Sequence, residues 1–172
     1  MSQNKKRYDP TPEYPSCLYE SPLGLIRITE DGQGIRSLHF AEGQAVPTGQ
    51  GGLYLADARR QLAEYFAGKR RDFDLPLSPH GTPFQEKVWA ALRAIPYGET
   101  RCYQQIARMT GSEQAARAVG MANNRNPIAI LIPCHRVVGK NGALVGYAGG
   151  LWRKQYLLDL EARCAPGFEG PL

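Results

Sequence analysis

The sequence has none of the features that would place the protein in a membrane or direct it to secretion. Over 172 residues, no apolar run approaches the roughly 20 residues of a membrane-spanning helix. Residues 1–15 are polar, basic and rich in proline, and they lack the apolar centre of a signal peptide. We interpret them as a flexible lead and expect the protein to be cytoplasmic.

Cysteine is scarce and is not arranged for disulfides or a metal. The 4 cysteines are never at CxxC spacing, and without a secretion signal we expect no structural disulfide. Cys17, His39 and His80 fit no zinc-finger or ribbon spacing, so we predict no metal and no cofactor. Cys17 and Cys164 are interpreted as ordinary thiols near the chain ends, and Cys102 as a small apolar residue at a helix start.

Acidic residues are missing from a long stretch of the second half. Between Gln114 and Leu158 there is no Asp or Glu, and the chain as a whole has a net charge of +5. The basic residues of this stretch are Arg117, Arg125, Arg136, Lys140, Arg153 and Lys154. A solvated basic face would mix the two signs more evenly, so the pattern indicates a polyanionic substrate such as nucleic acid.

The first half, residues 16–80, is predicted to form a small α/β module. Leu25–Ile28 and Ile35–Phe40 are short alternating runs that are typical of strands. Turn-forming residues lie between them at Asp31–Gly34 and before them at Ser21–Gly24. With 42% hydrophobic residues in the chain, a real core can be buried.

A loop, a helix and a linker should complete this half. Residues 45–52 are rich in Gly and Pro and are predicted to be a loop. The next apolar positions recur at helical spacing, namely Leu55, Ala58, Leu62, Tyr65 and Phe66. Gly68 is the expected helix stop, and residues 72–81 are interpreted as a linker. Nothing in this half carries an obvious reaction.

The second half opens with a clear helix start. Thr82 can cap the helix, Pro83 suits its first position, and Gln85 can close a capping box. The apolar stripe of this helix is Phe84, Val88, Leu92 and Ile95. Pro96–Gly98 should end it.

Two short helices then form the outline of a helix-turn-helix. They are predicted at residues 103–109 and 113–123, around the turn Thr110–Ser112. Ser112 is the expected cap of the second helix. That helix is rich in small residues, which permit close approach either to DNA or to a neighbouring helix. The pattern alone leaves both readings open.

A cysteine beside a histidine is the most informative feature of the chain. The apolar run Ile128–Ile132, predicted to be a buried strand, leads into Cys134 and His135. A thiolate is the nucleophilic form of cysteine, and a neighbouring base can generate it. A Gly-rich loop at residues 142–150 and a final helix at residues 151–163 should follow, the helix with Leu157, Leu160 and Cys164 on its inner face.

Together these motifs closely resemble the O6-alkylguanine-DNA alkyltransferases, also called methylated-DNA–protein-cysteine methyltransferases. The match extends over about residues 82–161. It includes Tyr103–Gln105, Ala116–Gly120, Asn126–Pro127, Ile132–Gly139, Gly146–Gly150 and Lys154. The first half matches weakly, through Ser21–Gly24 and the order of its elements. The resemblance implies a two-domain α/β protein. Its parts are an RNase H-like domain, a mostly helical DNA-binding and alkyl-transfer domain over residues 81–164, and a tail over residues 165–172.

The resemblance also implies a mechanism and site residues. Cys134 would attack the alkyl carbon on O6 of a damaged guanine. His135 would take the thiol proton through a water, and Glu161 would orient His135. Tyr103 is the candidate donor to N3 of the leaving guanine. The product is a thioether that nothing in the sequence can reverse, so the protein should act once.

For binding, the resemblance implies double-stranded DNA containing O6-alkylguanine, with the damaged base flipped out. Arg117 would fill the gap left by that base, because its planar group can stack. Ala116, Ala118 and Gly120 would allow the helix to approach the minor groove. Asn126 corresponds to a hinge asparagine and is also an ordinary turn former.

The guanine would be read mainly by the backbone. Carbonyl groups of Cys134 and Val137 would accept from its exocyclic amine, and the amide of Ala148 would donate to O6. Tyr147 would form a wall of the pocket. Several relatives have Ser where this chain has Ala148, a change that a backbone contact survives and that bears on pocket polarity and substrate breadth. Some have Pro where it has Ala129, so we expect a roomier or differently shaped site. Ligands of the structural zinc of some relatives are not matched.

Three other interpretations are weaker. A lesion-binding protein of similar fold would lack the reactive cysteine, and Cys134 is present. A transcription factor would need more side chains for reading the major groove than the Ala-rich helix offers. A cysteine hydrolase would need an oxyanion hole and a peptide groove, and the basic surroundings favour DNA. Whether copies self-associate cooperatively on DNA stays open.

Overall fold

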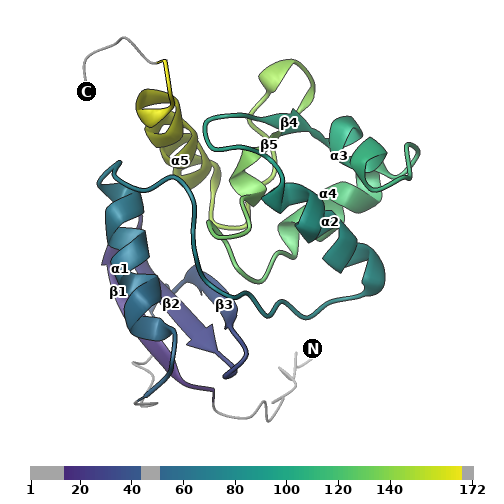
Figure 1. The fold of residues 1–172 in the computed structure, drawn as a ribbon. Helices are drawn as coiled ribbons and strands as arrows, with labels where there is room; N and C mark the ends of the chain where they lie inside the picture. The colour runs from purple at the N-terminus through teal and green to yellow at the C-terminus, as the bar shows by residue number, and fades with distance from the viewer. Residues whose placement is uncertain (1–13, 44–50, 168–172) are drawn as a thin grey trace, which may run out of the picture.

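The computed structural model describes residues 14–43 and 51–167. Its first part is an antiparallel sheet in the order β1-β2-β3, with strands β1 (Ser16–Ser21), β2 (Gly24–Glu30) and β3 (Ile35–Phe40). Helix α1 (Leu55–Phe66) packs along this sheet (Figure 1). The predicted loop at residues 45–52 lies mostly outside the described residues.

The two predicted turns and the alternating strands are confirmed. Ile26 and Ile28 of β2 are fully buried. The side-chain carboxylate of Asp31 accepts from the amide of Gln33 at 3.0 Å and fixes the β2–β3 turn. The Ser21 hydroxyl donates to the carbonyl of Gly24 at 2.7 Å across the β1–β2 turn. Local polar residues therefore set the register of this small sheet.

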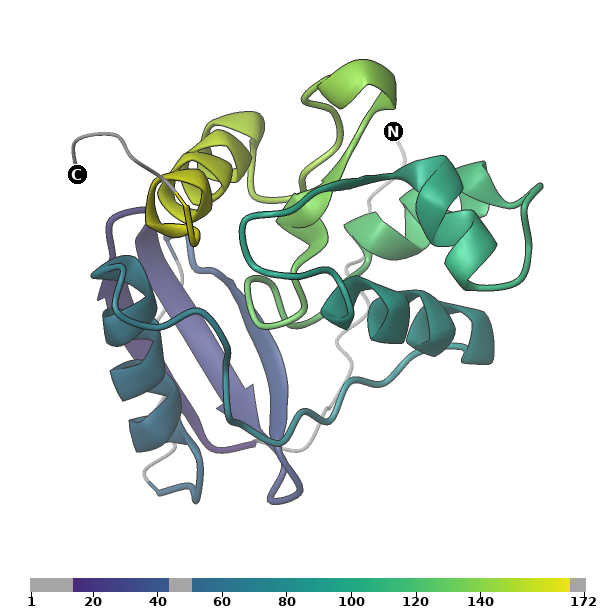
Figure 2. The same ribbon diagram turned by 45° about the horizontal axis from the view of Figure 1, so that its top comes forward.

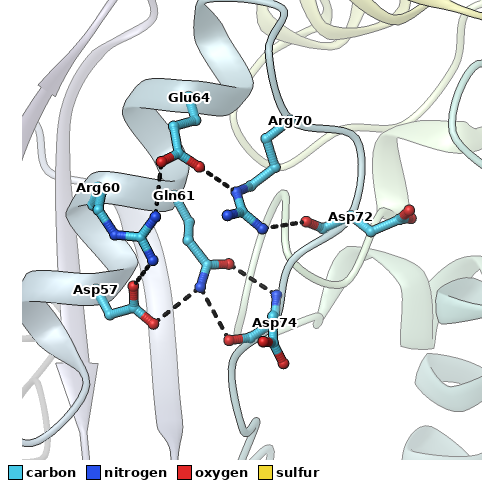
Figure 3. Close-up of polar contacts among 7 residues, drawn as sticks. All are labelled: Asp57, Arg60, Gln61, Glu64, Arg70, Asp72 and Asp74. Atoms are coloured by element: carbon cyan, nitrogen blue, oxygen red, sulfur yellow. Dashed lines mark hydrogen bonds and ion pairs between the residues drawn. The ribbon is translucent and has the colours of Figure 1, made fainter.

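Helix α1 ends where the sequence predicts, and the chain beyond it is fastened to the helix and the sheet. Gly68 has φ +73°, which is the left-handed conformation that glycine provides at a helix end. Gln61 donates to the carbonyl of Asp74 and accepts from its amide, at 3.0 and 2.8 Å (Figure 3). Farther along, Leu77 forms a bridge with Ile35 at the start of β3. The predicted linker is therefore held along the edge of the first part (Figure 2).

The second part is mostly helical. Its elements are α2 (Pro83–Arg93), β4 (Arg101–Cys102), α3 (Tyr103–Met109), α4 (Ala116–Asn124), β5 (Val137–Val138) and α5 (Leu151–Cys164), with short 3-10 turns at Cys134–Arg136 and Lys140–Gly142. The predicted capping box of α2 is present, since the Gln85 amide donates to Thr82 Oγ1 at 3.2 Å and the Thr82 amide to Gln85 Oε1 at 3.0 Å. Helix α5 lies at the junction of the two parts (Figures 1 and 2).

One core runs through both parts. Its fully buried members include Leu23 and Ile26 from the first part and Ile128 and Leu157 from the second part. The backbone also crosses over, because the Leu38 amide donates to the carbonyl of Pro127 at 2.9 Å. The edge strand β3 thus holds the segment that leads into Cys134.

Two local predictions in the second part are wrong. Helix α4 begins at Ala116 instead of residue 113, and Ser112 does not cap it. The reason is a tighter turn before the helix: the Ser112 carbonyl accepts from the Ala115 amide at 2.9 Å, and Gln104 Nε2 donates to the carbonyl of Glu113 at 2.6 Å. These bonds satisfy backbone groups that an earlier helix start would have used.

The predicted strand at Ile128–Ile132 is also absent. Only isolated bridges form there, and Ile130 has φ +71°. A left-handed β-branched residue interrupts any strand. An apolar run shows that a segment is buried, but it does not distinguish a strand from a buried loop.

Candidate active site

The loop at residues 126–132, which the side chain of Asn126 closes by hydrogen bonds, leads into Cys134. Asn126 Nδ2 donates to the carbonyl of Ile132 at 2.7 Å, and Asn126 Oδ1 accepts from the amide of Ile128 at 3.0 Å. The side chain of Asn126 therefore closes the loop that ends at Cys134. The second bond makes Asn126 a turn former, and the first ties the end of α4 to Ile132, two residues before the cysteine; the hinge role stays a prediction.

The Cys134 thiol is kept protonated in the resting protein. Only 5% of the residue is exposed. Burial raises the pKa of Cys134 above its usual value, although a hydrogen bond with Asn126 and the charge of Lys154 oppose this. A buried thiol with a raised pKa needs a base at the moment of reaction.

His135, the candidate base, is hydrogen-bonded to the carboxylate that is predicted to orient it. His135 Nε2 and Glu161 Oε1 are 2.7 Å apart, and both side chains are buried. Arg136 binds the same carboxylate, with Nε 2.9 Å from Oε2 and Nη2 2.9 Å from Oε1. Glu161 thus joins the last helix to the two residues that follow the cysteine.

Burial and two nearby cations favour the neutral form of the imidazole. Burial lowers the pKa of His135, and Arg136 and Lys154 lower it further, against the opposing effect of Glu161. Burial alone would raise the pKa of Glu161, but its contacts with His135 and Arg136 hold it well below the usual carboxyl range. His135 Nδ1 is buried and has no hydrogen-bond partner among the described residues. It is therefore free to accept a proton.

A pocket of about 530 Å³ opens onto the thiol. Its lining includes the predicted Asn126, Ala129, Cys134, Tyr147 and Ala148. It also includes residues of the first part that the sequence did not indicate, namely Leu38, His39, Phe40 and Glu42. Two buried atoms of lining residues, the Tyr147 hydroxyl and Asn123 Oδ1, have no hydrogen-bond partner among the described residues.

Val137 and Tyr103 lie beside this pocket and do not line it. The Val137 carbonyl accepts from the Lys154 ammonium group, which leaves one lone pair for a substrate amine. The Tyr103 hydroxyl donates to the carbonyl of Val145 at 3.4 Å. Burial raises the pKa of Tyr103, and nearby Cys134 adds to the effect, so the phenol stays protonated and can act as a donor.

The predicted DNA-contacting residues of α4 do not share one environment. Arg117 and Ala118 are exposed, whereas Ala116 and Gly120 are partly buried. A Cβ atom at Gly120 would lie 3.6 Å from the Tyr103 ring, so this glycine packs against α3. The packing reading is confirmed for Gly120, and contact of the exposed side of the helix with DNA stays a prediction.

Comparison with known proteins assigns both halves to one family. Residues 17–79 match the ribonuclease-like domain and residues 83–163 the DNA binding domain of 6-O-methylguanine DNA methyltransferase. A methylated-DNA–protein-cysteine methyltransferase of Methanosarcina acetivorans is 50% identical over 153 residues, which cover 86% of this chain and 98% of the relative. The chain belongs to the methylated-DNA–protein-cysteine methyltransferase family. The predicted two-domain α/β architecture is confirmed with it.

Solved structures support the same assignment. The O6-methylguanine methyltransferase of Mycobacterium tuberculosis has a TM-score of 0.79 at 44% identity, covering 89% of this chain and 95% of that one. The M. tuberculosis protein in complex with DNA has a TM-score of 0.78 at 45% identity, covering 87% and 94%. This methyltransferase is thus a DNA-binding repair protein that transfers an alkyl group to cysteine.

Sequence reasoning missed several residues of the methyltransferase site. Arg136 stands in the same motif as Cys134, but only the structure shows it bound to Glu161. Arg153 and Tyr65 carry no local signal, because their partners are distant in sequence. No group of three or more His, Cys, Asp or Glu side chains in residues 14–43 and 51–167 is placed to hold a metal ion. None of the helices in these ranges is long and apolar enough to cross a membrane.

Proposed function

We propose that this methyltransferase repairs O6-alkylguanine in duplex DNA by transferring the alkyl group to Cys134, once per protein molecule. The observation that carries the proposal is the Cys134 thiol at the base of a pocket, next to a histidine whose free nitrogen can accept a proton. An exposed arginine on α4 and the basic stretch around the site favour a DNA substrate.

The reaction would be a single displacement. The thiol proton passes to His135, through a water, and the sulfur lone pair forms a bond to the alkyl carbon. The bond between that carbon and O6 breaks, and its electron pair goes to the guanine, which takes a proton at N3 from Tyr103. The thioether product holds the alkyl group permanently, because no residue nearby can displace it.

Access to the carbon would require the damaged base to leave the helix, which costs a few kcal/mol. Arg117 would fill the space, and its exposure on α4 beside the small side chain of Ala118 supports this role. Asn126 would hold the loop between α4 and the cysteine in register. These roles are assigned by position and by the family resemblance.

Inside the pocket, guanine would be held mainly by the backbone. The Ala148 amide would donate to O6, and the carbonyls of Cys134 and Val137 would accept from the exocyclic amine. Tyr147 would form a wall of the pocket. The small side chains of Ala129 and Ala148 favour a site that tolerates larger alkyl groups. Cooperative self-association on DNA and a cytoplasmic location stay predictions.

The decisive experiment is the mass of the intact protein after mixing with an oligonucleotide that contains O6-methylguanine. We expect one added methyl group per protein, mapped to Cys134 by peptide analysis, with no further gain at excess substrate. Cys134→Ala should gain nothing and still bind the DNA. Lesion-selective binding without added mass in the wild type would instead indicate a damage-recognition protein.

A further inference from the structure

The carboxylate that orients His135 has a ligand from the first part of the protein. The hydroxyl of Tyr65, on α1, donates to Glu161 Oε1 at 2.7 Å. Both side chains are buried, and the two residues are 96 positions apart in the sequence. Neither the helix nor the tyrosine belongs to the alkyl-transfer half of the chain.

Tyr65 completes the set of donors around Glu161. Oε1 accepts from Tyr65, from His135 and from Arg136 Nη2. Oε2 accepts from Arg136 Nε at 2.9 Å and from the Gly98 amide at 3.4 Å. A buried carboxylate with all its lone pairs in use is held firmly in one orientation.

The tyrosine ring has little freedom to leave this position. It packs at centroid distances of 5.4 Å from Phe66, 5.3 Å from Phe73 and 6.1 Å from Tyr97. On the same helix, Glu64 binds Arg70 at 2.6 Å, and the paired bonds of Gln61 and Asp74 lie alongside (Figure 3). Helix α1 is thereby tied to the segment that follows it, next to Tyr65.

The direction of the hydrogen bond decides its chemical effect. Burial raises the pKa of Tyr65 well above its usual value, and the charge of Glu161 adds to this, so the phenol stays a donor. Its positive hydrogen and the Arg136 cation both offset the negative charge that Glu161 presents to His135. The carboxylate can then fix the imidazole through Nε2–H without drawing a second proton onto the ring.

We propose that Tyr65 is a positioning residue for the transfer reaction, holding Glu161 so that His135 stays neutral with Nδ1 ready for the thiol proton. The inference rests on the proposed function, because it assigns His135 the role of base. It also gives the first part of the chain a role in the transfer reaction, through Glu161.

The test compares Tyr65→Phe with wild type over a range of pH. The full-length proteins react with an O6-methylguanine oligonucleotide, and the transfer rate is followed from pH 5 to pH 9. Other charged or titratable groups near the pair are Cys134 and Arg136 in the 3-10 turn, Lys154 on α5 and Tyr97 before β4. They are the same in both proteins.

We expect the acid limb of the Tyr65→Phe profile to move up by about one pH unit, because one lost hydrogen bond to a charge changes an ionisation by about that much. The rate should fall by up to about tenfold at pH values on the acid limb and much less near pH 8. Tyr97→Phe is the matched control, since it removes a neighbouring hydroxyl that is not bonded to Glu161 and should leave the profile in place.

A Tyr65→Phe profile that superimposes on wild type would reduce Tyr65 to a packing residue, even if the variant melts earlier. A wild-type protein that transfers no methyl in this assay would overturn the proposed function and the inference with it. Histidine nitrogen NMR of the wild type gives a check that needs no variant, because the chain has only 3 histidines. A neutral His135 protonated only at Nε2 near pH 7 is expected, and an imidazolium there would contradict the proposal.

Discussion

Arg153 of α5 donates through Nε to the carbonyl of Leu23 at 2.9 Å, joining the last helix of the chain to its first β-hairpin turn. The same guanidinium donates through Nη1 to the carbonyl of Gly149 at 2.8 Å. It also lies over the Phe40 ring, 4.2 Å from the centroid. A Cβ atom at Gly149 would come within 2.8 Å of that ring, so this wall of the pocket is closely packed on the first part.

Replacing Arg153 by Met should therefore affect both stability and reaction. The loss of buried, charge-assisted hydrogen bonds should lower the free energy of unfolding by about 2–4 kcal/mol. Transfer to Cys134 should also slow, because Gly149 loses its anchor beside the pocket. Urea unfolding and transfer rates at 25 °C measure the two effects. Arg163→Ala, an exposed change on the same helix, is the control. An unchanged transfer rate in Arg153→Met would mean that Arg153 does not help to shape the pocket.

The neighbouring residue, Lys154, holds an earlier part of the Gly-rich loop at residues 142–150. It is fully buried, and its ammonium group donates to the carbonyls of Val137, Val145 and Gly146. Burial lowers the pKa of Lys154 to about 8, although Cys134 opposes the change. The folded protein should therefore lose this proton at a lower pH than the unfolded chain.

This difference predicts how stability changes with pH. Between about pH 8 and the ordinary lysine value near 10.4, the unfolded chain binds more protons at this residue, so the Lys154 contribution to the free energy of unfolding rises with pH. The free energy of unfolding of wild type should rise relative to that of Lys154→Met by up to about 1.4 kcal/mol per pH unit. Denaturant unfolding at pH 7.5, 8.5 and 9.5 measures it. A constant gap would mean that Lys154 titrates normally.

The parts of the fold that could be predicted are those set by local chemistry. The limits of α1 and α2 follow from Gly68 and from the Thr82 capping box, which act within one turn of the helix. The turns of the first hairpins depend on Ser21 and Asp31, which bond to their own neighbours. Failures occur where the deciding contact is not local, as with Ile130, whose left-handed backbone belongs to a loop clasped by Asn126.

The same distinction holds at the site. Cys134 and His135 could be recognised because they are adjacent, whereas Glu161 was identified only through the family resemblance, being 26 positions from His135. Nothing in the sequence near Tyr65 marks it as a partner of Glu161, because its amphipathic helix explains its burial fully. The contribution of the first part to the pocket is a consequence of tertiary packing, which residue patterns do not encode.

The role of Arg117 can be tested by separating extrusion of the base from chemistry. Its side chain is exposed on α4, outside the residues that line the pocket. Arg117→Ala should slow transfer from duplex DNA by at least about tenfold, since base extrusion costs a few kcal/mol and, in the proposed role, the arginine offsets part of that cost. Transfer from the free base O6-methylguanine should be unchanged, because that substrate needs no extrusion. Arg108→Ala, an exposed change on α3, controls for the loss of positive charge alone. Equal losses with both substrates would exclude Arg117 from base flipping and point to a distorted pocket.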